Sequence, residues 1–189
     1  YWSMDDEDLE RLPMEGWVAY LKGQEPDYPV KAMQQDLVDI RRKVKEVVYE
    51  DTATPDTRLS DNPNPYNTDT IGTLVKLMLG GLPTGRAGFP LHCRVRYFDP
   101  KKRRAGMPED VGALVDEMTT DEIALTLVNV NQVQERTVVV QGGAYAEHQI
   151  EEIEVGDQVV PVNDSAFSVH LAPGAGRRLV LKMARYANQ

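Results

Sequence analysis

The stretch from residue 123 to residue 185 determines the predicted fold. It reads IALTLVNVNQVQERTVVVQGGAYAEHQIEEIEVGDQVVPVNDSAFSVHLAPGAGRRLVLKMAR. Short runs rich in β-branched residues alternate here with turn signals such as Gly156-Asp157, Asn163-Asp164 and the PGAG sequence at 173–176, a pattern typical of consecutive short strands. The predicted strands span residues 123–130, 136–141, 148–155, 158–162, 166–171 and 178–185.

The side-chain pattern within these strands indicates one buried and one exposed face, because neighbouring side chains of a strand point to opposite sides. The alternating apolar residues are Phe167, Val169 and Leu171 in one strand and Leu179, Leu181 and Met183 in another. Connections this short favour antiparallel pairing and a sandwich. With a further strand at 91–98, the prediction is an α+β protein: a helical N-terminal segment followed by an antiparallel β-sandwich of about seven strands.

The N-terminal half has helical periodicity instead. Asp27 and Pro29 mark a helix start, and an apolar seam with spacings of three and four follows, formed by Val30, Met33, Leu37, Ile40, Val44 and Val47. The seam is shorter than the heptad runs of free-standing coiled coils, so we expect it to pack on neighbouring parts of its own chain. Further helices are predicted near Ser3, over residues 13–23, and after Asn67 as an N-cap, the last one stopped by Gly80-Gly81.

Two segments follow from this division. Residues 1–88 form the helical segment with a Pro/Asn-rich connection, and residues 89–189 form the β-sandwich. One inserted helix is predicted at 108–118, because Val111, Leu114, Val115 and Met118 recur at helical spacing. Strands near Val128 and at 138–140 are apolar on both faces. We therefore expect the helical segment to cover the face of their sheet that does not point into the sandwich core.

Composition excludes several classes of protein. The formal net charge of -9 argues against nucleic-acid binding, which depends on clustered Lys and Arg. A single cysteine, Cys93, excludes a disulfide framework, and no apolar run is long enough to cross a membrane. The chain begins at Tyr1 rather than at a methionine, so we expect it to be a piece of a longer polypeptide, with a periplasmic or secreted location favoured over a cytoplasmic one.

One strand carries the candidate binding residues. His92, Arg94 and Arg96 share a face that ends at Phe98, and this basic stripe could hold a carboxylate, a sugar acid or an acidic partner. Cross-strand salt bridges with the glutamates of 147–154 are the structural alternative. Cys93 falls on the opposite, inward face and is expected to be a core residue.

The remaining chemistry-bearing residues form no recognisable site. The three histidines have no metal-binding spacing, so no metal and no cofactor are predicted, and no pair of carboxylates stands out as a catalytic acid and base. The helical half holds most of the large aromatic residues, which we expect to fill an interface between segments: Trp2, Trp17, Tyr20, Tyr28, Tyr49 and Tyr66.

Part of the chain resembles a known class of module. The stretch 126–186 contains TLVNVNQVQERTVVVQGGAYAEHQIEEIEV, a Gly-Asp hairpin and VNDSAFSVHLAPGAGRRLVLKM. It resembles the C-terminal β-sandwich regions that end many bacterial glycoside hydrolases and related large secreted enzymes. The resemblance implies a supporting role, and it carries over no catalytic residue.

The functional expectation is therefore a non-catalytic C-terminal supporting region of a larger bacterial, carbohydrate-active enzyme. Its partner would be the remainder of that polypeptide or another subunit. Two alternatives stay open: a module that binds an acidic glycan or another ligand, and a self-contained hydrolase or lyase that uses carboxylates.

Overall fold

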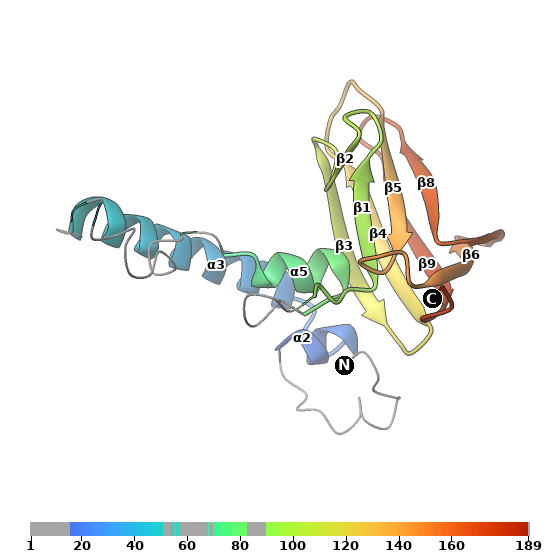
Figure 1. Cartoon of the computed structure of the whole chain (residues 1–189), viewed down its shortest axis with the longest axis horizontal. Helices are drawn as coiled ribbons and strands as arrows, with labels where there is room; N and C mark the ends of the chain where they lie inside the picture. The colour runs from blue at the N-terminus through green and yellow to red at the C-terminus, as the bar shows by residue number, and fades with distance from the viewer. Residues whose placement is uncertain are drawn as a thin grey trace.

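The protein is a two-layered antiparallel β-sandwich with helices at one side (Figure 1). The computed structural model describes residues 16–50, 54, 56, 68, 70–82 and 90–188. One sheet has the strand order β2-β1-β5-β8 and the other the order β3-β4-β9-β6-β7. The strands are β1 Val95–Asp99, β2 Arg104–Ala105, β3 Val111–Met118, β4 Glu122–Asn129, β5 Arg136–Gly142, β6 Gln149–Val155, β7 Gln158–Asp164, β8 Ala166–Leu171 and β9 Gly176–Ala184.

The predicted α+β sandwich is confirmed, but the described residues form nine strands rather than about seven. The inserted helix at 108–118 was wrong, because this segment forms strand β3, which pairs with β4 from Val111 opposite Asn129 to Met118 opposite Ile123. Both faces of β3 are covered. Val115 is buried in the core, whereas Leu114 packs on a helical cluster. Because both faces of the strand carry apolar residues, their spacing in the sequence resembles that of a helix.

The core fills the space between the two sheets. Strand β1 directs Val95 and Tyr97 inward, and both are at most 2% exposed. Strand β4 contributes Leu125 and Leu127, and β9 contributes Leu181, all three of them fully buried. Side chains from both sheets therefore meet in one continuous apolar core, as a sandwich requires.

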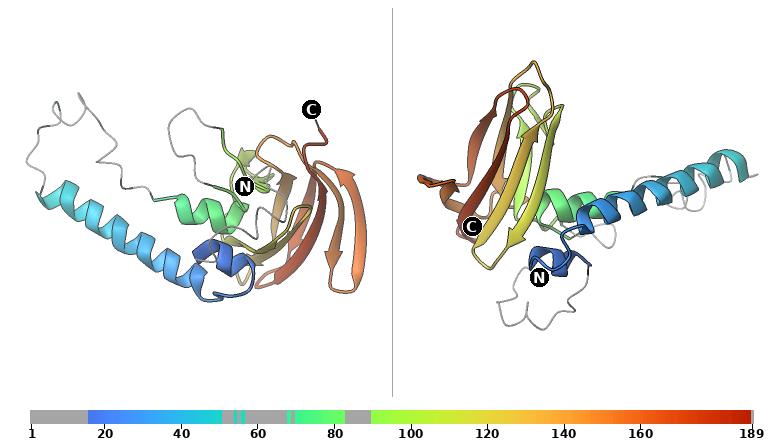
Figure 2. Two further views of the ribbon diagram at one scale, coloured as in Figure 1. Left: turned by 90° about the horizontal axis from the view of Figure 1, so that it is seen from below. Right: turned by 180° about the vertical axis from the view of Figure 1, so that it is seen from behind.

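Helix α3, Tyr28–Lys45, projects away from the sandwich (Figures 1 and 2). It continues into a π-helical turn, Glu46–Glu50. Only the start of the predicted seam packs on the body, through Met33, whereas Val30 is 61% and Leu37 47% exposed. No residue of α3 is fully buried. Half of the seam is exposed, namely Val30, Leu37 and Val44, and the other half is partly buried.

The other two described helices attach the helical side to strand β3. Helix α2, Gly16–Leu21, buries Trp17 and Tyr20 against Leu77 of helix α5, Gly72–Leu79. Leu114 of β3 packs on the same cluster. The helices therefore cover the β3 side of the sandwich and leave Val128 of β4 36% exposed.

The end of α5 is tied to the sandwich by hydrogen bonds. Gly80 stops the helix in a left-handed conformation, with φ 58°, as predicted. The last carbonyl groups of a helix lack partners within it. Here the Tyr97 hydroxyl donates to the Met78 carbonyl over 2.6 Å, and the Arg94 N–H donates to the Leu79 carbonyl over 3.0 Å.

Other predictions have mixed outcomes. Cys93 is 1% exposed, which confirms its inward position, and no described helix combines the length and the apolar character needed to span a bilayer. Tyr49, by contrast, is 80% exposed rather than part of an interface. The helix near Ser3, the cap at Asn67, and the residues Trp2 and Tyr66 lie outside the described part of the chain.

Candidate functional site

The three predicted binding residues do not converge on one site. His92 lies before β1, is exposed, and forms a bridge with Leu82. Arg94 is 2% exposed and donates to the carbonyl groups of the turn at 119–120 over 2.7 and 2.8 Å. Arg96 donates to the Ala144 carbonyl over 2.9 Å instead. The two guanidinium groups thus bind different loops, and ligand binding by this trio stays a prediction.

The alternative interpretation is a set of salt bridges from this strand to the glutamates of 147–154. Among the described residues, Arg94 and Arg96 bond backbone carbonyl groups instead. Glu147 accepts hydrogen bonds from the N–H groups of Ala144 and Tyr145. Glu152 lies 3.6 Å from Lys182 of β9. Glu147 and Glu152 therefore have partners of their own, and Arg96 places its guanidinium 5.3 Å from the centre of the Phe98 ring.

A second arginine lies close to Arg94. The burial of Arg94, and then the positive charge of Arg185, which follows the end of β9, lower the pKa of Arg94 to about 10. The buried Nε of Arg94 and the buried Nε and Nη2 of Arg185 have no hydrogen-bond partner. Unpaired buried donors are costly, so this Arg94–Arg185 cluster is suited to an anion.

His148 borders the cluster and adds no positive charge at neutral pH. It is 1% exposed, and burial is the main reason that its pKa is lowered. Its Nδ1 accepts a hydrogen bond from the Tyr186 N–H over 3.2 Å, so the ring proton is on Nε2. No local pattern in the sequence points to this grouping, because Arg185 and His148 are remote from Arg94 along the chain.

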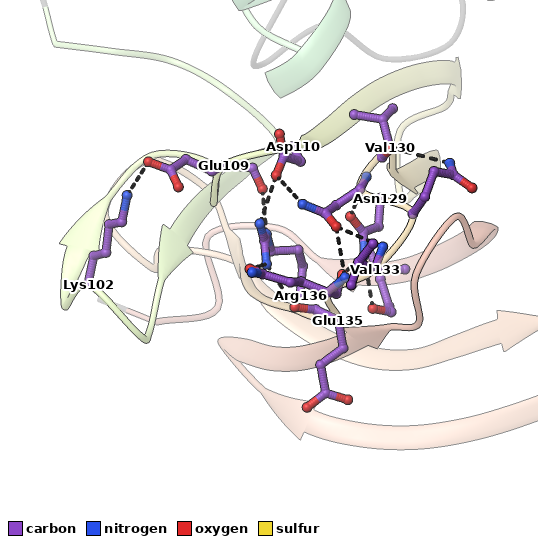
Figure 3. Close-up of polar contacts among 12 residues, drawn as sticks. Lys102, Glu109, Asp110, Asn129, Val130, Val133, Glu135 and Arg136 are labelled. Atoms are coloured by element: carbon purple, nitrogen blue, oxygen red, sulfur yellow. Dashed lines mark hydrogen bonds and ion pairs between the residues drawn. The ribbon is translucent and has the colours of Figure 1, made fainter.

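A polar network joins the loops at the opposite end of the sandwich, as Figure 3 shows. Arg136 at the start of β5 forms an ion pair of 2.7 Å with Asp110 and donates to the Glu109 carbonyl over 2.9 Å. Asn131 donates to the same Asp110 carboxylate. These bonds from Asn131 and then Arg136 lower the pKa of Asp110. The network fixes the loop before β3 to the loop after β4.

Asn129 supports the same end from inside. It is fully buried, and its Nδ2 lies 2.8, 3.3 and 3.1 Å from the carbonyl groups of Gln134, Leu171 and Ala172. A cavity of about 340 Å³ beside the network contains both signs of charge, including Lys102 and Glu109, which form an ion pair with each other. Because Lys102 pairs with Glu109 and Arg136 pairs with Asp110, we interpret these contacts as structural: they hold the loops of this end together.

An apolar opening lies on the helical side. A groove of about 600 Å³ runs between α3, α5 and the edge strand β3, and we call it the helical groove. It is lined by Val30 and Leu37 of α3, Leu74 and Met78 of α5, and Ala113 of β3. Exposed apolar surface on this scale marks an interaction site more often than a feature of a free surface.

The described residues contain no group of three or more His, Cys, Asp or Glu side chains that could hold a metal ion. Cys93 is not positioned to react, because burial raises its pKa to about 12. No known family model matches the chain, and comparisons with curated proteins and with solved structures give no match either. Its function therefore has to be proposed from its geometry and from the resemblance stated above.

Proposed function

We propose that this chain is a non-catalytic supporting module that packs onto a catalytic domain of a larger polypeptide through the helical groove. The observation that carries the proposal is the groove itself. Its apolar side chains, such as Val30, Leu37 and Leu74, are 61%, 47% and 37% exposed. Burying one such side chain fully contributes about 1.5–3 kcal/mol, so covering several of them would hold a partner firmly.

The shape of this surface favours a folded protein as the occupant. The exposed seam of α3 extends from Val30 to Val44, which corresponds to about 21 Å of helix. A small ligand cannot cover that length together with the groove, whereas a domain surface can. The resemblance to the C-terminal sandwiches of bacterial glycoside hydrolases is consistent with such a partner, and it suggests a carbohydrate-active enzyme.

The test starts from the native gene product. Its intact mass shows whether the polypeptide is longer than this chain, and the additional segment is then produced separately and mixed with it. Calorimetry should detect a complex that Leu37→Asp or Leu74→Asp weakens about tenfold or more. Val133→Asp is the matched control, because Val133 is 84% exposed in the loop after β4 and should leave the affinity unchanged.

Two results would contradict the proposal. One is the failure to detect a complex that the aspartate substitutions weaken. The other is robust turnover by this chain alone across a panel of hydrolase and lyase substrates.

A second candidate function is the binding of an acidic glycan at the Arg94–Arg185 cluster. The observation that favours it is the set of three unpaired guanidinium donors, since arginine recognises carboxylates through paired N–H groups. Calorimetry with oligogalacturonate should give heat that a neutral oligosaccharide does not. Arg185→Gln should remove it, whereas Arg178→Gln, at a residue paired with Asp116, should not. No heat above background would eliminate this candidate.

A further inference from the structure

A different groove opens along the side of the sandwich where β7 and β8 are the outermost strands of their sheets. It has a volume of about 430 Å³, and we call it the edge groove. Its apolar walls come from both sheets and include Ile153, Val155, Val160, Val162, Phe167 and Val169. The sheets do not close over these side chains, and Val160 remains 47% exposed.

One wall of the edge groove is the free edge of β8. The Gly142 N–H donates to the Ser165 carbonyl over 2.8 Å. Hydrogen-bonded pairs alternate along an antiparallel ladder, so Ser168 and His170 direct their backbone groups away from β5 and into the groove. Both residues line it, although the His170 ring lies outside it, 2.9 Å from the Thr137 hydroxyl. The wall therefore presents unpaired backbone donors and acceptors.

The facing strand β7 is less suited to pairing. Pro161 stands in the middle of β7 and lines the same groove. Proline has no N–H to donate, and it is one of the residues by which exposed sheet edges avoid pairing with other chains. A pairing segment would consequently add to β8 and not to β7.

A cation marks one end of the edge groove. Arg177 of β9 lies opposite the buried Leu127, so its side chain points to the inner face, and it lines the groove. No hydrogen bond or ion pair to another described residue engages its guanidinium. Asn129, two residues beyond Leu127, bonds the Leu171 carbonyl, which places Arg177 toward the Leu171 end of β8.

We infer that the edge groove binds an extended peptide segment of another protein, which adds a strand to β8. Alternate aliphatic side chains of the segment fill the groove, and a carboxylate near its end pairs with Arg177. The free backbone groups of Ser168 and His170 favour a peptide over an acyl chain, because only a peptide can satisfy them. The inference is independent of the helical groove.

The probe is the acetylated and amidated peptide ETVTVTV, in which Glu and Val share one face. Calorimetry should show saturable binding below about 1 mM, and amide resonances of Ser168 and His170 should shift in NMR spectra. The same peptide with proline at its central threonine should not bind. Replacing the peptide Glu by Gln should weaken its binding to the natural chain. The Arg177→Gln variant of the chain should bind the Glu peptide and the Gln peptide with equal affinity.

Variants of the chain complete the test. Ser168→Pro removes an N–H that faces the groove and should abolish binding, whereas Ser168→Ala should not. If Ser168→Pro does not fold, Val160→Lys serves instead, because it places a charge in the groove. Val159→Lys is its matched control, since Val159 is 56% exposed on the opposite face of β7.

Either of two results would overturn the inference. One is the lack of saturable peptide binding, and the other is binding that Ser168→Pro and Val160→Lys leave unchanged. Dodecanoate, measured below its critical micelle concentration, tests whether an acyl chain occupies the groove instead of a peptide. If it binds in the edge groove and the peptide does not, the groove is a site for amphiphiles.

Discussion

The hydrogen bond from Tyr97 to helix α5 allows a direct test of whether the helices and the sandwich form one folding unit. Tyr97→Phe keeps the ring in the core and removes only the hydroxyl that donates to the Met78 carbonyl over 2.6 Å. Tyr97 is 2% exposed, so water cannot easily replace the lost donor. Leaving one buried carbonyl without a partner costs about 1–2 kcal/mol.

The expected result is a fall in the free energy of unfolding of about 1–2 kcal/mol in urea titrations followed by circular dichroism. For a chain of this length it corresponds to a drop in Tm of about 2–8 °C. Amide exchange at Gly80 and Gly81 should also become faster, because these residues close the last turn of α5. Tyr145→Phe is the control, since Tyr145 is 65% exposed and should show no loss.

Alkaline pH adds a second measurement on the same residue. Burial, and then the nearby Cys93, hold the pKa of Tyr97 well above its ordinary value of 10.0. In the unfolded chain this phenol ionises from about pH 10 upward, whereas in the folded chain it stays neutral. The free energy of unfolding should therefore fall as the pH rises above 10, and the Tyr97→Phe variant should lose less.

Coupling of α5 to the sandwich through Tyr97 is refuted if Tyr97→Phe changes the free energy of unfolding by less than about 0.5 kcal/mol. It is also refuted if α5 loses its exchange protection in a separate step from the sandwich in the natural chain. In that case the helices would form a unit of their own.

Three further outcomes follow from buried groups. Burial raises the pKa of the Cys93 thiol from 9.0 to about 12, so the thiol should react slowly with iodoacetamide at pH 8 until urea unfolds the chain. Fast labelling of the folded chain would contradict this. The stabilising contribution of the neutral thiol should fall as the pH rises from 9.0 toward 12. Asn129→Ala should lower the free energy of unfolding by about 2–4 kcal/mol in urea titrations, because it leaves buried carbonyl groups unpaired. Gly142→Ala should destabilise the chain strongly, because a Cβ there would lie 2.6 Å from the His148 carbonyl oxygen. Gly112→Ala, with nothing within 4 Å, is its control, and equal Tm values for the two variants would be inconsistent with the packing described.

The sequence identified most of the sandwich but failed at one strand for a physical reason. Period-two alternation predicts a strand only if one of its faces is polar. Strand β8 satisfies this condition, with Val169 buried and Ser168 exposed. Strand β3 does not, because Leu114 on its outer face packs on the helical cluster while Val115 enters the core. Two covered faces produced a helix-like spacing, which could not be distinguished from a helix without knowing the tertiary contacts.

The candidate site shows a similar division. The sequence placed Arg94 and Arg96 on one strand, but β1 begins at Val95, so only Arg96 lies on it. The two long side chains reach different loops. The neighbour that matters for Arg94 is Arg185, which follows β9 and comes close only after the sheets assemble. The local sequence pattern predicts the strand position of an arginine, but only the tertiary structure shows which groups its guanidinium contacts.

By itself, then, the sequence determined the properties that neighbouring residues share: the strands from 123 to 185, the turn at 156–157, the helix that starts at Tyr28, and the inward position of Cys93. Tertiary structure alone decided the strand order, the identity of β3, and which apolar faces remained uncovered. Strand order, and with it the open helical and edge grooves, depends on contacts between residues far apart in the chain. Local periodicity carries no information about such contacts, because it reports only which face of an element is apolar and not what covers that face.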